Sequence, residues 1–578
     1  MKKIKNIAFA AALVPVVLLS SCSNDYLDRA PSTAMDTEVI LNDPSLVPST
    51  VVGTMSMMAS ASAWGRDLVV VGDVVTDLVN TTRRNQGTMQ DIEQWIVTTN
   101  STDAASFWAA PYQIAASAAR TVEAAKRLLA DSASLSDDEI EQLYNSIATS
   151  LTVKVFCEYT LAQYFCLDYN LDDNNGGKQH TIPGTNPTKV GIILLKDRAL
   201  GNSEPANMSS LEDTYTFMEQ EIADAINAYG KSQNTCMLGA ADVRYYPSIT
   251  ALYMIQAKVH LAQHEYNEAL QAAENALSNL SVVGANGELI SSAENLIAAY
   301  GATPSSEDIW QLNYTSQDNL SANSLNTLFG TYGFSPTPYA YGLFETDDIR
   351  RALYSSSTGS APSSESGSWC LKYAADDGVF NVPVLRVPEL YLIKAECEAA
   401  LDGNGSRAYA TLYNNLISKR DTTVTEENFA ARYPNLVASA TFQTYPANGV
   451  AQGFLAGLMD EYARELLCEG QRWSFLRRNG IALSREGSRE DQDFRSHFMN
   501  YPLCRFSYPV PFVEFSTQQW KDGRPVDLAG NPIPGQSKNW QTNAWDEANG
   551  NNYSLQVELP EEGFDYQNQN DRPGVAIE

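Results

Sequence analysis

Two histidines one helical turn apart are the first residues of this chain whose spacing could bind a metal. His260 and His264 stand at i and i+4, so on a helix both imidazoles would face the same side, as zinc ligands do. The stretch after His264 lacks the second histidine of the H-E-x-x-H motif, and Gln263 stands where the inverted motif requires glutamate. The pattern favours a plain junction between two helices, and we expect no metal there.

A second candidate for metal chemistry is the acidic stretch that begins at Asp168. Asp168 to Asp172 opens like a calcium-binding loop, but Asp173 replaces the turn glycine and Gln179 stands where the closing glutamate belongs. This stretch is therefore interpreted as a solvated acidic loop.

Motifs for enzymatic chemistry are missing from the sequence. It contains no G-x-S-x-G nucleophile motif, no phosphate-binding glycine loop and no dinucleotide fingerprint. Only four histidines are available as general bases, and acidic residues are too numerous for one glycosidase pair to be singled out. We expect a binding protein with no catalytic residue and no cofactor.

The N-terminus has the features of an exported and lipidated protein. Three lysines precede a short apolar run, Ile7 to Leu19, which is too short to span a bilayer. The run ends in Leu19-Ser20-Ser21-Cys22, which resembles a bacterial lipoprotein lipobox. In that interpretation residues 1–21 are a signal peptide, Cys22 carries lipid, and residues 22–45 form the anchor and tether.

The remaining seven cysteines are an odd number without any C-x-x-C pair. Cys157, Cys397 and Cys468 fall in stretches with helical periodicity, where cysteine behaves as a small buried hydrophobe. This pattern argues against a disulfide framework and leaves a single bridge open.

Composition and charge exclude several classes of partner. Of the 578 residues 44% are hydrophobic, which is ample for a packed core. Without the three lysines of the signal, 36 basic residues face 69 acidic ones, a net charge of −33. Such a balance argues against binding to nucleic acid or to anionic lipid, because both require a basic surface.

Helical periodicity dominates the chain from about residue 100. The clearest unit runs from Ser248 to Leu280, where two apolar-periodic segments flank a turn at Gln263 to Tyr266. Alanines at 257, 269 and 276 match the tetratricopeptide pattern, which uses small residues where two helices approach closely. Weaker helical pairs lie at 151–164, 211–229 and 388–419. We predict a mainly α fold, a tetratricopeptide-like repeat scaffold with long ordered loops at 168–208, 300–345, 355–380 and 485–570.

Three stretches, Pro383 to Glu396, Glu461 to Gly480 and Tyr508 to Glu514, together resemble the SusD/RagB family of surface nutrient-binding lipoproteins. They are similar to its P-V-I-R-x-x-E-x-Y-L-I-x-A-E, R-x-x-E-L with E-G-x-R-W, and P-I-P-x-x-E patterns. In physical terms these motifs are structural. Arg386 and Glu389 are placed to pair, and Glu461, Arg464, Glu465, Glu469 and Arg472 lie at helical spacing that predicts ion-pair ladders.

The resemblance implies a lipid-anchored protein on the outer face of a Gram-negative outer membrane. It would bind nutrient polymer fragments, most readily oligosaccharide, and deliver them to a SusC-like TonB-dependent transporter. Peptide uptake of the RagB type is the alternative. The implied body, 46–578, divides into an N-terminal part at 46–380, the strongest family signature at 381–514, and a loop-rich C-terminal part at 515–578.

Two groups of residues are candidates for ligand contact. Sugars are recognised by flat aromatic faces together with amides and charges, and the segment from 310 to 344 offers both. Its candidates are Trp310, Tyr314, Tyr332, Tyr339 and Tyr341, with Asn313, Gln317 and Asn319 nearby. A second, N-terminal cluster consists of Asp77, Arg83, Arg84, Asn85 and Trp95.

Overall fold

A computed structural model describes most of the chain between residues 41 and 485. The described residues are 41–170 except 83, 96, 99 and 167, then 190–195, 208–232, 241–355, 369–374, 378–446 and 449–485, with short pieces at 498–499, 507–508, 510–511, 520–521 and 524–525.

The predicted tetratricopeptide-like unit is a pair of helices, α10 (Ile249–Ala262) and α11 (Tyr266–Ser278). Ala257, Ala269 and Ala276 are completely buried, as expected for small residues where two helix backbones approach each other. The turn between the helices holds His264 at a positive φ of 60°. This confirms the helical pair predicted from the sequence.

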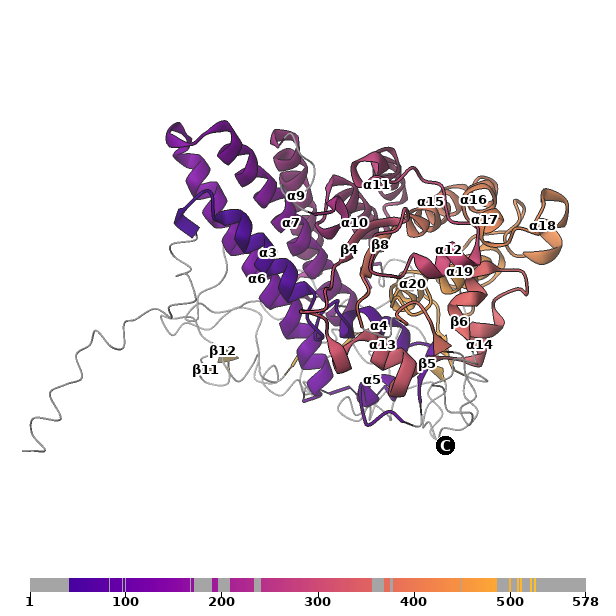
Figure 1. Ribbon diagram of the computed structural model, residues 1–578. Helices are drawn as coiled ribbons and strands as arrows, with labels where there is room; N and C mark the ends of the chain where they lie inside the picture. Colours follow the sequence, from indigo (N-terminus) through magenta and orange to yellow (C-terminus); the bar gives the residue numbers. More distant parts are fainter. Residues whose placement is uncertain are drawn as a thin grey trace, which may run out of the picture.

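Successive long helices pack against one another and build the helical scaffold (Figure 1). In packing order they are α3 (Val47–Met58), α6 (Thr102–Ala130), α7 (Asp137–Phe165), α9 (Leu211–Lys231), α10, α11, α15 (Val387–Asp402) and α16 (Ala408–Leu412). The sequence signal at 151–164 is only the second half of α7, which begins at a capping box formed by Ser136 and Glu139. The mainly helical fold is therefore confirmed.

The other α-helices of the described residues lie outside this series. The helices are α4 (Asp67–Val74), α5 (Gln90–Glu93), α12 (Ala293–Ala298), α13 (Leu325–Thr327), α14 (Pro338–Gly342), α17 (Ser418–Arg420), α18 (Glu426–Arg432), α19 (Gly453–Leu466) and α20 (Arg472–Arg478).

The described strands form two-stranded antiparallel pairs. These pairs are β1 (Val79–Thr81) with β5 (Phe334–Pro336), β2 (Val190–Ile193) with β3 (Met208–Ser210), β4 (Asp308–Leu312) with β8 (Val382–Arg386), β6 (Tyr354–Ser355) with β7 (Trp369–Cys370), β9 (Leu483–Ser484) with β10 (Phe498–Met499), and β11 (Trp520–Lys521) with β12 (Arg524–Pro525). Two of these pairs, β1 with β5 and β4 with β8, join parts of the chain that are far apart in the sequence.

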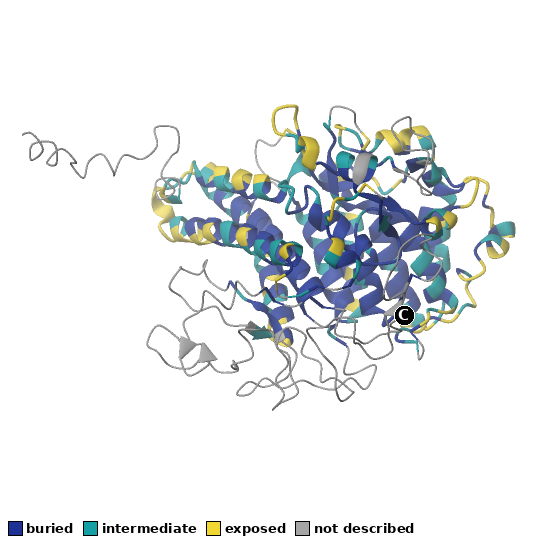
Figure 2. Cartoon of the chain, turned by 90° about the horizontal axis from the view of Figure 1, so that it is seen from below, coloured by how far each residue is buried: buried dark blue, intermediate teal, exposed yellow. Residues whose placement is uncertain are grey.

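The hydrophobic core extends as one cluster through the described residues, from Val47 to Val510 (Figure 2). Trp310 and Trp473 are its largest fully buried side chains. No helix in the described part of the chain combines the length and the apolar character needed to cross a membrane.

The ion pairs of the family motifs differ from those expected. Glu389 pairs with Lys258 of α10, whereas Arg386 binds Glu469 at 2.7 Å and Glu465 at 3.3 Å. The expected Arg386–Glu389 pair is therefore wrong. The two residues lie on either side of the junction between β8 and α15, which places their side chains against different partners.

Of the ion-pair ladder predicted along the helix, the structure contains the pair between Arg464 and Glu461, at 2.7 Å. Helix α19 ends at Leu466, and the following turn contains positive φ angles at Cys468 and Gly470. Glu469 and Arg472 consequently leave the helical register and bind residues from distant segments.

Glu465 is the centre of this buried network. Its carboxylate accepts hydrogen bonds from Arg420 at 2.9 and 3.0 Å, from Arg350 at 3.2 Å and from Arg386 at 3.3 Å. Burial opposes ionisation of Glu465, but the three guanidinium groups outweigh it and hold the pKa of this carboxyl well below its usual range. The strongest sequence motifs therefore serve the fold.

Candidate functional site

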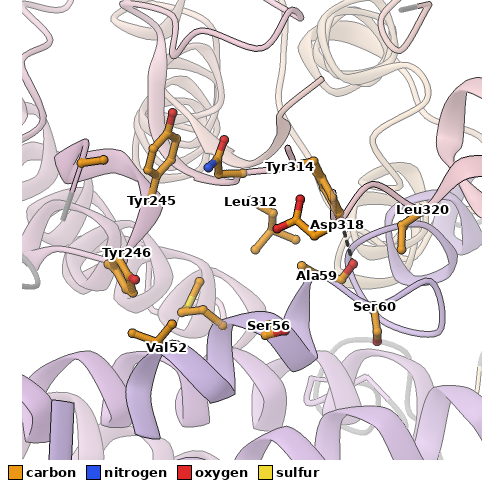
Figure 3. A pocket seen from close by; sticks show the side chains of 13 residues that line it. Val52, Ser56, Ala59, Ser60, Tyr245, Tyr246, Leu312, Tyr314, Asp318 and Leu320 are labelled. Atoms are coloured by element: carbon orange, nitrogen blue, oxygen red, sulfur yellow. Dashed lines mark hydrogen bonds between the residues drawn. The ribbon is translucent and has the colours of Figure 1, made fainter. Parts of the chain in front are cut away.

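A pocket of about 510 Å³ lies between α3, the segment before α10 and the segment after β4 (Figure 3). This volume is within the range of small-molecule sites. We call it the tyrosine pocket; its lining residues are Val52, Met55, Ser56, Ala59, Ser60, Ala241, Tyr245, Tyr246, Leu312, Asn313, Tyr314, Asp318 and Leu320.

Helix α3 forms one wall of the tyrosine pocket. One face of the helix is held against α6, where Thr54 and Ser117 share a hydrogen bond of 2.8 Å. The opposite face presents Val52 and Ser56 to the pocket, and Val52 is 48% exposed. An exposed valine beside a serine hydroxyl gives this wall an amphipathic surface.

Tyr245 and Tyr246 form the second wall. They end a short 3-10 turn, Val243–Tyr245, which is capped by Asp242 through the backbone N–H of Arg244 at 2.9 Å. The Arg244 side chain fixes the turn further, because it pairs with Asp242 at 2.7 Å and donates to the Ser305 carbonyl at 2.8 Å. Both tyrosine rings are half-buried, so each keeps an accessible face.

The third wall follows β4, where the chain turns out of the strand. Tyr314 is buried and donates a 2.6 Å hydrogen bond from its hydroxyl to the Ala59 carbonyl, which ties this wall to the end of α3. Its burial raises the pKa of the Tyr314 hydroxyl, which keeps that group protonated. Asn313 and Asp318 are exposed beside it.

Among the described residues that line the pocket, Asp318 is the only charged one. One carboxylate oxygen accepts from the backbone N–H and the hydroxyl of Thr315, at 2.5 and 2.7 Å. Nearby cations are already paired, because Arg66 binds Asp67 at 2.6 Å and Arg244 binds Asp242. The pocket is therefore weakly acidic, with aromatic faces, an amide and hydroxyls.

Such a lining can bind a polyhydroxylated ligand. Tyrosine faces pack on the C–H surface of a sugar, while amide and carboxylate groups hydrogen-bond its hydroxyls. The lining residues that the structure describes include no nucleophile paired with a general base.

The aromatic residues expected at 310–344 have different locations. Trp310 is completely buried, and its ring contacts Phe156 with centroids 5.4 Å apart. This corrects the expectation that Trp310 is free to stack on a sugar: β4 is buried on both faces. Tyr314 lines the tyrosine pocket. Tyr332 lies at the end of a π-helical turn, Leu328–Tyr332, and its side chain lies outside the described residues.

Tyr339 and Tyr341 lie on α14, away from the pocket lining. Both are half-buried. Burial raises the pKa of Tyr339 to about 12, although the nearby Arg472 opposes this. Arg351 covers the ring of Tyr341 at 5.0 Å and donates to its hydroxyl at 3.1 Å.

The residues of the predicted N-terminal cluster also differ in location: Asp77 and Trp95 are buried, whereas Arg84 is exposed. Asp77 accepts hydrogen bonds from Arg472 at 2.8 and 3.0 Å. Trp95 is buried, donates to the Val75 carbonyl at 2.8 Å and lies under the Arg485 guanidinium, so its expected role as a ligand platform is corrected to a core role.

Arg84 is exposed and Asn85 is half-buried. Asn85 donates to the Gly333 carbonyl at 3.2 Å, so the two predicted groups do meet where β1 pairs with β5. Arg83 and the lipidation residue Cys22 lie outside the described residues.

The two histidines with metal-like spacing bind separate partners. His264 donates from Nε2 to the Arg478 carbonyl at 2.5 Å, and burial lowers its pKa. His260 instead contacts Glu265, with Nδ1 2.6 Å from Oε2. Glu219 joins this pair, and the three side chains bring possible ligand atoms within 4.8 Å of one another. Gln263 bridges the two glutamates, so hydrogen bonds within the cluster account for its geometry.

Tyr245, Tyr246, Asp318 and the α3 residues were not anticipated from the sequence. The tandem tyrosines between a capped turn and a helix were the available signal, since large half-buried aromatics in a connection need a structural or binding reason. The sequence of α3 alone does not indicate that its exposed face lines a pocket with residues from distant segments.

Comparisons with known proteins identify the fold. The model of the SusD family matches residues 373–571. A SusD superfamily protein from Bacteroides vulgatus ATCC 8482 has a similar crystal structure, with a TM-score of 0.66 and 19% identity over 82% of this chain and 97% of that one. A SusD superfamily protein from Bacteroides thetaiotaomicron VPI-5482 gives 0.65 and 17% over 82% and 97%.

A structure described as a putative sugar binding protein, also from Bacteroides vulgatus ATCC 8482, gives a TM-score of 0.64 and 19% identity, covering 82% of this chain and 97% of that one. No curated protein matches the sequence. The family resemblance noted in the three sequence motifs is confirmed.

Proposed function

We propose that this chain, whose residues 373–571 match the model of the SusD family, binds nutrient oligosaccharide in the tyrosine pocket. The observation that carries the proposal is the combination of two accessible tyrosine faces with Asn313 and Asp318 around one cavity. The solved relative described as a putative sugar binding protein supports the same ligand class. The chain would act as a binding protein and not as an enzyme.

We extend the proposal to the cell surface. Lipid on Cys22 would anchor the chain in the outer membrane of a Gram-negative bacterium, with the body facing outward. There it would deliver its ligand to a SusC-like TonB-dependent transporter. Arg84 and Asn85 follow β1 in the sequence, and Tyr339 and Tyr341 follow its partner β5, so these four residues are second candidates for ligand contact.

Glycan binding is tested with mature protein that begins after Cys22, by affinity electrophoresis against a panel of polysaccharides followed by calorimetry on the best ligand. Tyr245→Ala and Tyr246→Ala should each weaken binding by about five- to tenfold, the equivalent of about 1 kcal/mol lost per stacking face. Tyr409→Ala is the matched control, because Tyr409 is an equally half-buried tyrosine on α16 and does not line the pocket.

Two results would contradict the assignment. Equal loss of affinity in Tyr409→Ala would mean that the pocket variants act through stability. Binding that is lost in Tyr339→Ala or Tyr341→Ala, but kept in Tyr245→Ala, would move the site to the second surface. A peptide library in place of the glycan panel tests the RagB-type alternative.

A further inference from the structure

Cys370 and Cys468 lie beside each other in the core although they are far apart in the sequence. Cys370 is 2% exposed and Cys468 is completely buried. The thiol of Cys370 is within hydrogen-bonding reach of the Cys468 sulfur. Neighbouring thiols of this kind are candidates for a disulfide bond, which requires Cα atoms no more than about 7 Å apart.

Two tyrosines hold the segments that carry these cysteines together. Tyr354 of β6 stands opposite Cys370 in the antiparallel pair and donates to the Leu467 carbonyl at 3.0 Å. Tyr373 donates to the Cys468 carbonyl itself at 3.1 Å. These two tyrosine hydrogen bonds therefore hold the segment of Cys370 against the turn of Cys468.

The turn at Cys468 fixes the direction of its side chain. The sequence predicted a helix there, but α19 ends two residues earlier and Cys468 has a φ of 67°, which is uncommon for a residue other than glycine. Cys157 and Cys397 do lie in helices, α7 and α15.

We propose that Cys370 and Cys468 form a disulfide bond in the exported protein. The proposal uses the export predicted from the lipobox, because compartments outside the cytoplasm favour disulfides. The oxidant is the disulfide of an envelope thiol–disulfide oxidoreductase. The thiolate of one cysteine attacks that disulfide and forms a mixed disulfide. The second thiolate then attacks the cysteine sulfur, so two protons leave the chain and two electrons reduce the oxidoreductase to its dithiol.

The order of events follows from burial. In the folded protein neither thiol is accessible to an oxidoreductase, and burial raises the pKa of Cys468, which keeps it from forming the reactive thiolate. The bond therefore forms while the chain is still folding. Once the core has closed, the same burial shields the bond from reductants. It would link β7 to the turn that carries Glu469 and Gly470.

The test uses the full-length chain made with its own signal in an oxidising cell envelope. Free thiols are alkylated during lysis, the protein is denatured, and processing at Cys22 is checked by mass spectrometry. Non-reducing peptide mapping should then yield one cross-linked peptide pair containing Cys370 and Cys468, lighter by the two lost hydrogens. Cys370→Ala should leave Cys468 alkylated, whereas the matched control Cys397→Ala should keep the cross-link.

Thermal unfolding gives an independent readout. Wild-type protein that has been reduced and refolded should melt at a lower temperature than the oxidised form, and this difference should vanish in Cys370→Ala and Cys468→Ala. Full alkylation of both cysteines in correctly processed wild-type protein would overturn the proposal, even if the alanine variants fail to fold.

Discussion

Arg386 donates two hydrogen bonds to Glu469, with Nε 2.9 Å from Oε2 and Nη2 2.7 Å from Oε1, although the residues are 83 positions apart. This bidentate pair fastens the end of β8 to the turn after α19. Lys372 binds the same carboxylate at 2.5 Å. Charge-assisted pairs of this geometry are directional, so they fix how the strand and the turn meet.

Removal of one carboxylate from this buried network should destabilise the protein strongly. Glu465→Gln leaves Arg350, Arg386 and Arg420 without their shared anion, and breaking a buried ion pair costs about 3–5 kcal/mol. Urea unfolding followed by circular dichroism measures the loss. Glu274→Gln is the control, because its pair with Lys394 is partly exposed and worth about 1 kcal/mol or less. Equal losses in the two variants would contradict the central role of Glu465.

Two glycines in helices should respond to alanine in opposite directions. A Cβ on Gly72 of α4 would lie 1.9 Å from the Gly470 carbonyl oxygen, so Gly72→Ala must displace backbone and should cost about 3 kcal/mol or more. A Cβ on Gly53 of α3 would meet no atom within 4 Å, so Gly53→Ala should stabilise the protein by about 0.5–1 kcal/mol. Melting temperatures of both variants give the comparison, and a stable Gly72→Ala protein would refute the close approach.

Stability should decline as the pH rises from about 4 to about 7 because of two buried aspartates. Burial raises the pKa of Asp73 and of Asp308 from 3.8 to about 7. Each carboxyl holds its proton more tightly in the folded state than in the unfolded state. Its stabilising contribution is therefore complete below pH 3.8 and is lost as the pH rises through 7.

Asp73→Asn should remove part of this decline, because the amide does not titrate and can still accept from the Gly470 N–H. Urea unfolding at several pH values between about 5 and 8 measures the slope. Asp402→Asn is the control: Asp402 is half-buried and its hydrogen bonds with Arg407 lower its pKa, so it titrates below this window. An unchanged slope in Asp73→Asn would show that Asp73 is ionised in the folded protein.

The charge of Asp318 should select among sugars. Its carboxylate is the only charge among the described residues of the tyrosine pocket, so a uronic or sialic acid would bring a second anion beside it. We expect neutral oligosaccharides to bind more tightly than acidic ones of equal length. Asp318→Asn keeps an oxygen that can accept from Thr315 but removes the charge. In calorimetric titrations, the difference in affinity between neutral and acidic oligosaccharides should therefore become smaller. Preference for acidic sugars in the wild type would exclude this site.

Lipidation at Cys22 should decide membrane attachment. Cys22→Ala removes the thioether position of the lipobox, so the protein should remain unprocessed or leave the membrane fraction. Fractionation and mass spectrometry of the mature N-terminus measure this outcome. An unmodified N-terminus at a different residue in the wild-type protein would disprove the lipobox assignment.

The sequence by itself determined the elements whose signals are local. The helical period and the alanines at 257, 269 and 276 predicted α10 and α11, because a helix must bury its apolar face every few residues. The three family motifs also identified the fold, since each is a short run of residues. Two residues of the predicted segment 310–344, Asn313 and Tyr314, line the tyrosine pocket, and their contact with a ligand stays a prediction.

Only the tertiary structure decided which side chains line the pocket. Trp310 and Tyr314 are four residues apart and equally aromatic, yet β4 buries the first and the chain turns outward at the second. Arg386 likewise forms its ion pair with Glu469 and not with Glu389, which is only three residues away in the sequence. The turn after α19 places Glu469 beside Arg386. The tyrosine pocket joins α3, a turn before α10 and the segment after β4. Such contacts depend on how distant elements pack, and side-chain type and spacing within one segment do not contain that information.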